Sequence, residues 1–129
     1  MKKFYICSIE VNVVGKRKTF FGKREHLAGA TTYIEREVIY EENKEREIAE
    51  KLCDNYRKTL QEKINKDKKV EILDYSDPLY CFETFQEILY IDILNINIRE
   101  ATIQECIEKL TPTEYAEIYG NKLIIKGGK

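Results

Sequence analysis

The segment NKEREIAEKLCDNYRKTLQEKINK, residues 43–66, decides the fold because it has the pattern of one long amphipathic helix. Its large apolar residues recur every four positions: Ile48, Leu52, Tyr56, Leu60 and Ile64. At 100° per residue these positions share one stripe, which is the face that a helix buries against a sheet. The opposite side is charged, and several of its pairs have the i,i+4 order that stabilises a helix by a few tenths of a kcal/mol each. The segment therefore predicts a helix that covers a sheet.

The totals indicate one ordinary globular domain over residues 1–129. A chain of this length buries roughly two thirds of its unfolded surface without disulfides or metals. Hydrophobic residues make up 43% and charged residues 35%, which is typical of a globular protein with a charged surface. The formal net charge of -1 argues against a protein whose whole surface binds nucleic acid, but it allows a local basic patch.

The amino terminus does not have the pattern of a signal peptide. Lys2 and Lys3 precede an apolar run, but Ser8, Glu10 and Asn12 interrupt it and no small-residue cleavage site follows. No window approaches the roughly 18 apolar residues of a membrane helix. We therefore expect a cytoplasmic protein that does not bind a membrane.

Cysteine and histidine usage predicts no metal site and no cofactor. The four cysteines are far apart in the sequence, form no CxxC pair, and accompany only one histidine. Cys53 and Cys106 lie on the apolar faces of predicted helices. We therefore expect these two thiols to be reduced, buried and inert.

The residues before the long helix have the chemistry of strands. Residues 4–14 alternate, with Tyr5, Cys7 and Val11 among the residues on one side and polar residues on the other. Gly15 predicts a turn, and residues 18–22 then return as the second strand of a hairpin. Residues 22–32 have no period and predict a loop, and residues 33–40 predict a strand that leads into the helix.

The residues after the long helix alternate between turns and strands. Residues 70–75 predict a short strand, and residues 76–78 fit either a turn or a helix start with Pro78 at its first position. Residues 79–86 fit a short helix and a strand equally well. Residues 88–98 predict a long strand, apolar on both faces at first and polar on one face at Asn95 and Asn97.

The last third has clear helix signals. Thr102 and Thr111 each precede a glutamate by three residues, which is the capping-box pattern of two short helices. Gly120 is placed to end the second helix, and residues 123–125 predict a final edge strand. Together the elements predict an α+β fold: an antiparallel sheet of about five to six strands, one long helix packed on a face, and short C-terminal helices.

The strongest local functional pattern is GKRKTFFGKREH, residues 15–26. Cations interleaved with Phe20 and Phe21 suit phosphates and bases, so the pattern predicts an anion-binding hairpin for a nucleotide or nucleic acid. The alternative is a solvated hairpin whose phenylalanines fill the core. The predicted ligand-binding residues are Lys16, Arg17, Lys18, Phe21, Lys23, Arg24, His26, Thr31 and Thr32.

The segment after this hairpin adds small residues and two hydroxyls, at Thr31 and Thr32, which could approach an anion closely. It has neither the GxxxxGK[ST] nor the GxGxxG pattern, and a simple connecting loop is the alternative. No pattern places a serine or cysteine nucleophile near His26, so no catalytic residues are predicted.

Acidic residues and tyrosines predict protein contacts. Six glutamates between Glu35 and Glu47 could mimic a nucleic-acid backbone and block a basic channel on another protein, or form an ordinary solvated face. The nine tyrosines are of a kind enriched at interfaces. The surplus of apolar and tyrosine surface also predicts a homo-oligomer, most simply a two-fold dimer.

These patterns favour a small intracellular, non-enzymatic binding protein of phage or mobile-element type, which inhibits or sequesters a partner such as a host-defence component. The composition, rich in Lys, Ile and Glu and poor in Ala, is typical of AT-rich phage and bacterial genomes, and this is an argument by analogy. One alternative is a protein that sequesters a nucleotide or another phosphorylated small molecule. A second alternative is a small hydrolase that uses His26 with a carboxylate.

Overall fold

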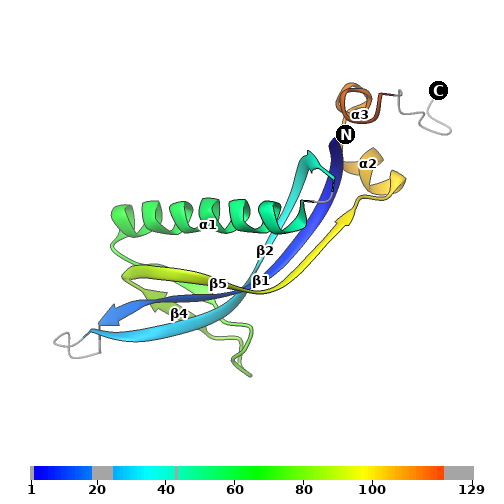
Figure 1. Cartoon of the computed structure of the whole chain (residues 1–129). Helices are drawn as coiled ribbons and strands as arrows, with labels where there is room; N and C mark the ends of the chain where they lie inside the picture. Colours follow the sequence, from blue (N-terminus) through cyan, green and yellow to red (C-terminus); the bar gives the residue numbers. More distant parts are fainter. Residues whose placement is uncertain (1, 19–24, 43, 121–129) are drawn as a thin grey trace.

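A computed structural model describes residues 2–18, 25–42 and 44–120 of the chain. Its main sheet has three antiparallel strands in the order β2-β1-β5. The central strand is β1 (Lys2–Lys18), flanked by β2 (Glu25–Glu41) and β5 (Glu87–Glu100). The strands bend along their length, and α1 (Glu45–Asp67) lies on the inner side of the bend (Figure 1). The predicted α+β class and the antiparallel pairing are therefore confirmed.

The core lies between α1 and the face of β1 that carries its odd-numbered residues. Cys7, Ile9 and Val11 are almost fully buried there. Helix α1 contributes Ile48, Leu52, Cys53, Leu60 and Ile64 to the same cluster. This arrangement confirms the predicted long helix, its apolar stripe and the inward direction of the odd residues of β1.

The helix ends by a backbone cap. Lys68 adopts a left-handed conformation with φ of 68°, and its N–H donates to the carbonyl of Ile64 at 2.7 Å. Such a cap satisfies a carbonyl that the last turn leaves free.

The predicted turn at Gly15 is wrong, because this residue lies inside β1. A Cβ atom at Gly15 would lie 2.2 Å from the carbonyl oxygen of Glu87 and 2.7 Å from the ring of Phe85. Glycine is needed here for close packing of β1 against its neighbours, and not for a reversal of the chain. Residues 19–24, between β1 and β2, lie outside the described residues, and so does most of the predicted return strand 18–22.

The predicted loop 22–32 is also wrong from Glu25 onwards, because β2 begins there. Each of these residues pairs with β1 in an unbroken antiparallel register, from Glu25 opposite Lys18 to Thr32 opposite Val11. Backbone pairing in a hairpin outweighs the weak strand propensity of glycine and alanine. The predicted strand 33–40 is the second half of the same strand.

The sheet is smaller than the expected five to six strands, because two strands form a separate sheet. This second sheet pairs β3 (Val70–Leu73) with β4 (Phe82–Phe85). Both edges of β1 are already occupied along most of its length, so β3 and β4 cannot join it there. The ambiguous segment 79–86 contains strand β4 and no helix. The predicted edge strand 123–125 lies outside the described residues.

Two short helices, α2 (Ile103–Lys109) and α3 (Pro112–Tyr119), follow β5. Both predicted capping boxes are present: the N–H of Glu105 donates to Thr102 Oγ1 at 3.2 Å, and that of Glu114 donates to Thr111 Oγ1 at 3.2 Å. The helices bury Phe4 with Cys106, Leu110 and Ile118 in a second cluster. This cluster covers one end of the sheet on the side away from α1. No described helix is long and apolar enough to cross a membrane.

We predict that Leu52→Ala lowers the free energy of unfolding by about 2–5 kcal/mol, because it removes a buried side chain from the face of α1 that packs on the sheet. Urea denaturation measures this loss. Lys58→Ala, on the exposed side of the same helix, is the matched control. A loss below about 0.5 kcal/mol for Leu52→Ala would show that this face is not core.

Gly15→Ala should destabilise the fold by about 1–3 kcal/mol, because the new methyl group overlaps the backbone of Glu87 and the ring of Phe85. Gly29→Ala is the control, since its Cβ would meet only the Asn12 side chain at 3.4 Å. Thermal unfolding of both variants tests the difference. Equal stabilities would mean that Gly15 is not held by close packing.

Candidate functional site

The described cations of the predicted basic hairpin are paired with carboxylates of other strands. Arg17 Nη1 lies 2.6 Å from Glu83 Oε1 of β4, and Lys16 Nζ lies 4.0 Å from Glu87 Oε2 of β5. Their partners are therefore not in the acidic region 35–47. Phe21, Lys23 and Arg24 lie outside the described residues, and so does the side chain of Lys18. That part of the anion-binding hairpin stays a prediction.

The two threonines of the predicted site are engaged elsewhere. The N–H of Thr31 donates to Asp74 Oδ1 at 3.1 Å, and its carbonyl accepts from the N–H of Tyr75 at 2.8 Å. Thr32 is buried opposite Val11, on the core side. Thr31 is five residues from His26 along β2, roughly 17 Å in a strand. The structure does not bring the threonines to the cations.

His26 lies opposite Arg17 in the hairpin, and its Nε2 accepts a hydrogen bond from Arg17 Nε at 2.8 Å. That nitrogen is thus occupied by a cation rather than aimed at a nucleophile. Among the described residues no group of three or more His, Cys, Asp or Glu side chains is arranged to hold a metal ion. This geometry gives the hydrolase alternative no support.

Three of the four cysteines are buried, as expected for Cys53 and Cys106. Burial raises the pKa of the Cys7 thiol to about 11, and it also raises the pKa values of Cys53 and Cys106. These thiols stay protonated near neutral pH, and a protonated thiol is a poor nucleophile.

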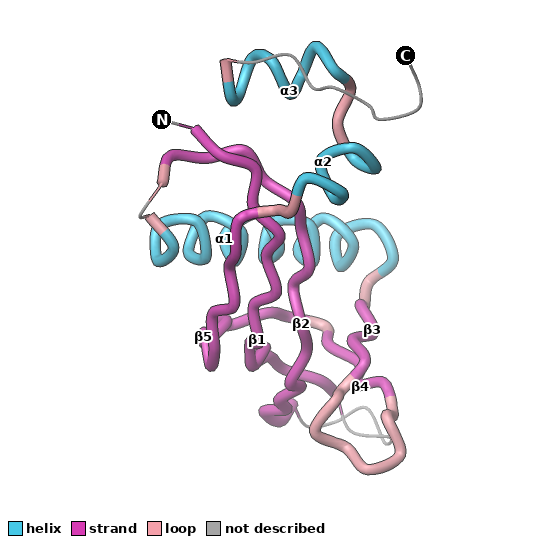
Figure 2. The backbone as a smooth tube through the Cα atoms, turned by 90° about the vertical axis from the view of Figure 1, so that its right-hand side faces the viewer, coloured by secondary structure: helices cyan, strands magenta, loops and turns pink. Residues whose placement is uncertain are grey.

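Within residues 2–18, 25–42 and 44–120, no helix or loop covers the side of the sheet opposite α1 beyond the end where α2 lies. We call this surface the open face, and Figure 2 looks onto it, with α1 behind the strands. The strand registers align its side chains in rows across the three strands. From β2 through β1 to β5 the rows are Glu37, Ile6 and Arg99; Glu35, Ser8 and Asn97; Tyr33, Glu10 and Asn95; Thr31, Asn12 and Asp92; and Gly29, Val14 and Tyr90.

The centre of the open face is negative. Its middle rows carry Glu35, Glu10 and Asp92 but no lysine or arginine. Glu10 accepts a hydrogen bond from the hydroxyl of Tyr33 at 3.1 Å, and this bond raises the pKa of that tyrosine. A hollow of about 640 Å³ lies beside Glu35. The centre therefore presents carboxylates, amides and hydroxyls to solvent.

The cations beside the open face are already paired. Arg99 donates two hydrogen bonds to the carboxylate of Glu105, at 2.6 and 2.8 Å, and Lys109 Nζ lies 3.4 Å from Glu37 Oε1. The Arg99 guanidinium lowers the pKa of Glu105 to about 2. Neither cation is left to neutralise the centre of the face.

Three tyrosine rings form an exposed aromatic cluster next to this centre. Tyr33 and Tyr75 meet edge to face with ring centroids 5.1 Å apart, and Tyr75 and Tyr80 do so at 6.0 Å. All three rings stay accessible, from 41% for Tyr33 to 61% for Tyr80. Leu79 and Phe82, in and just after the same β3–β4 connection, are more exposed still. Exposed rings of this kind are typical of protein interfaces.

Asp74 positions the cluster by tying the β3–β4 connection to β2. Its Oδ1 accepts from the N–H of Thr31 at 3.1 Å, the N–H of Ser76 at 2.9 Å and the hydroxyl of Ser76 at 2.6 Å. Partial burial raises the pKa of Asp74, but these three hydrogen bonds outweigh burial and bring the pKa below its ordinary value. The ionised carboxylate therefore fixes Tyr75 beside Tyr33.

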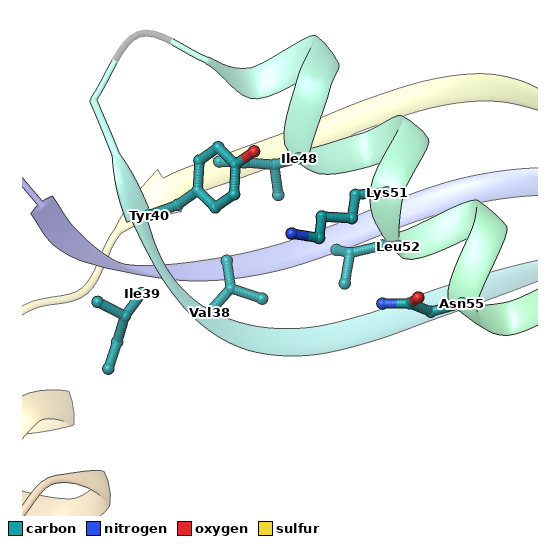
Figure 3. A pocket seen from close by; sticks show the side chains of 7 residues that line it. All are labelled: Val38, Ile39, Tyr40, Ile48, Lys51, Leu52 and Asn55. Carbon is teal, nitrogen blue, oxygen red and sulfur yellow. The ribbon is translucent and has the colours of Figure 1, made fainter.

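A groove runs between the outer edge of β2 and α1. A hollow of about 290 Å³ lies between Val38, Tyr40, Ile48 and Leu52 (Figure 3). A second hollow of about 200 Å³ continues along the helix toward Thr59, and Asn55 lines both. Figure 3 shows Ile39 pointing away from α1, on the other side of β2. We call these two hollows the β2–α1 groove.

No known protein family, curated protein or solved structure matches this chain. Its function is therefore inferred from its own surfaces. Sequence reasoning had recognised the polar residues of β1 and the polar end of β5, but it had not recognised that these sides form one uncovered surface. It also missed the cluster of Tyr75 and Tyr80 with Tyr33, for which the only sequence signal was the high tyrosine count.

We predict that Asp74→Ala frees the β3–β4 connection and lowers the free energy of unfolding by about 1–2 kcal/mol, because three hydrogen bonds to a carboxylate are lost. Since folding lowers the pKa of Asp74, the wild-type advantage should be complete at neutral pH and vanish as the pH falls through the folded pKa. Urea denaturation at several pH values measures it. Asp54→Ala, on the exposed side of α1, is the control, and a pH-independent difference would contradict this role for Asp74.

Proposed function

We propose that this chain is a non-enzymatic binding protein whose open face occupies a basic surface of another protein. The observation that carries the proposal is the group of carboxylates Glu10, Glu35 and Asp92, which have no ion-pair partner among the described residues. Exposed tyrosines border this group. Charge complementarity of this kind guides association and selects partners, while aromatic rings supply contact area at an interface.

The chemistry of the described residues supports binding over catalysis. The buried thiols are protonated, and His26 accepts a hydrogen bond from Arg17. The open face offers acceptors and hydroxyl groups on a rigid sheet, which suits recognition of lysine and arginine side chains. A rigid strand surface needs little ordering when a partner binds.

A nucleic-acid-binding protein is the partner class that this surface fits best. Carboxylates spread over a sheet can stand in for backbone phosphates and block a basic channel. The composition, typical of AT-rich phage genomes, adds the proposal of a phage or mobile-element protein that inhibits a host-defence component in the cytoplasm. Self-association as a dimer is a separate proposal, motivated by the exposed tyrosines.

The nucleotide-binding alternative rests on the basic hairpin alone. Lys16 and Arg17 would have to exchange Glu87 and Glu83 for a phosphate, and the Thr31 backbone is already bonded to residues 74 and 75. The open face needs no such exchange, which favours the protein-binding proposal.

The test is binding of the full chain to a panel of purified DNA- and RNA-binding defence proteins, measured by biolayer interferometry. The variant Glu10→Lys with Asp92→Lys should lose at least about tenfold in affinity, because it places cations against a basic partner. The control, Asp54→Lys with Glu62→Lys on α1, makes the same change in net charge away from the open face. Wild-type affinity should also fall between about 50 and about 300 mM salt. Failure of every basic partner to bind, or equal losses in both variants, would overturn the proposal.

A further inference from the structure

The outer edge of β2 carries backbone groups that nothing in the described chain uses. Both backbone groups of Thr31 point outward, to Asp74 and Tyr75. Because strand residues alternate, Tyr33, Glu35, Glu37 and Ile39 direct their N–H and C=O groups the same way. Among the described residues these four form no backbone–backbone bond on that side, and the Glu35 carbonyl accepts only from its neighbour Arg36, at 2.7 Å. The result is an edge about seven residues long, free to pair with another strand.

The β2–α1 groove lies directly beside this edge. The side chains of Val38 and Tyr40 point from β2 toward α1, where Ile48 and Leu52 close the groove (Figure 3). The side chains of Glu35, Glu37 and Ile39 lie on the other side, as the outermost row of the open face. An added strand would thus place alternate side chains in the β2–α1 groove, which is apolar at Val38, Ile48 and Leu52 and has Lys51 and Arg36 along its lining. The remaining side chains of the added strand would lie beside a row of carboxylates. A free edge next to a helix-lined groove is the arrangement used when peptides bind by strand addition.

We propose that an extended, basic segment of the partner adds to the sheet as a fourth strand beside β2. Its apolar side chains enter the β2–α1 groove, and its alternate lysine or arginine side chains lie over Glu35 and beside Glu37, which keeps its ion pair with Lys109. This inference rests on the proposed function, and it specifies how part of the basic partner is held. Backbone hydrogen bonds supply affinity, and the alternation of apolar and basic side chains supplies specificity.

The charges on the edge argue against a second copy of this chain as the added strand. If two copies pair antiparallel with Glu35 or Glu37 at the centre, that glutamate lies opposite the same glutamate of the second copy. With Arg36 at the centre, Glu35 of one copy lies opposite Glu37 of the other. With residue 38 at the centre, Glu35 lies opposite Glu41 of the second copy, and with residue 39 at the centre, Glu37 does. Like charges directly opposite each other destabilise a strand pair. Centres nearer Tyr33 are blocked, because residues 74 and 75 already bond to Thr31. A basic strand from a different protein meets none of these obstacles.

The test uses a nine-residue peptide of alternating lysine and valine with blocked ends, added to the full ¹⁵N-labelled chain. Amide hydrogen exchange is followed by NMR. In the free protein the amides of Tyr33, Glu35, Glu37 and Ile39 should exchange rapidly, while those of Ile34 and Val38, which face β1, are already protected. Bound peptide should slow the four outer amides at least about tenfold. A peptide with glutamate in place of lysine should have no effect.

A substitution in the groove separates strand addition from simple charge attraction. Asn55→Trp fills both hollows from an exposed position on α1 and should weaken peptide binding at least about tenfold. Asp54→Trp, the adjacent exposed residue, directs the same ring about 100° away around the helix and should leave binding unchanged. Circular dichroism checks that both variants fold.

Three results would overturn the inference. The peptide could bind without protecting the outer amides, both tryptophan variants could bind equally well, or the outer amides could become protected at high protein concentration without peptide, which would identify a second copy as the occupant. None of these would overturn the proposed function, which depends on Glu10 and Asp92 in the whole-protein panel. If no protein of the panel binds but the peptide still protects the outer amides, the proposed function is overturned and strand addition is not.

Discussion

The alternation of side chains along β1 is the constraint on which the rest of the structure depends. Odd-numbered residues bury themselves under α1, so even-numbered residues must face the opposite side. Only the end of that side, at Phe4, is covered by α2 and α3. A shift of one residue in the register would bring Glu10 and Asn12 into the core, and burying these polar side chains without partners would strongly destabilise the fold. The polar open face is therefore a direct consequence of the apolar core.

Periodicity predicted the elements that form because of residues close together in the sequence. The stripe from Ile48 to Ile64 and the threonine–glutamate capping boxes needed no knowledge of the rest of the chain. Gly15 was misread because glycine serves both turns and close approaches, and only the position of Phe85 and Glu87, some seventy residues later, decides between these uses. The first residues of β2 were missed for a similar reason: their pairing with β1 is a property of the hairpin and not of their own composition.

The candidate surfaces were harder to predict than the fold. The basic hairpin is conspicuous in sequence, yet Arg17 and Lys16 meet Glu83 and Glu87, which are distant in the chain. The open face and the β2–α1 groove are defined by what does not cover them, and a pattern of residues cannot reveal an absence of neighbours. Tyr33 illustrates this, since its role depends on Asp74 holding Tyr75 against it.

The two apolar clusters are of unequal size. Tyr5 belongs to the large cluster under α1, whereas its neighbour Phe4 belongs to the small one with Cys106, Leu110 and Ile118. Two adjacent residues of β1 therefore pack in different clusters, on opposite faces of the sheet. The small cluster has four buried side chains, and the hydroxyl of Tyr119 accepts a 3.0 Å hydrogen bond from the N–H of Phe4. Ion pairs from Arg99 to Glu105 and from Lys109 to Glu37 add to this attachment, so the two short helices together contact all three strands of the main sheet. The two helices therefore set where the open face ends: they cover Phe4 completely and leave Ile6 only partly buried at its border.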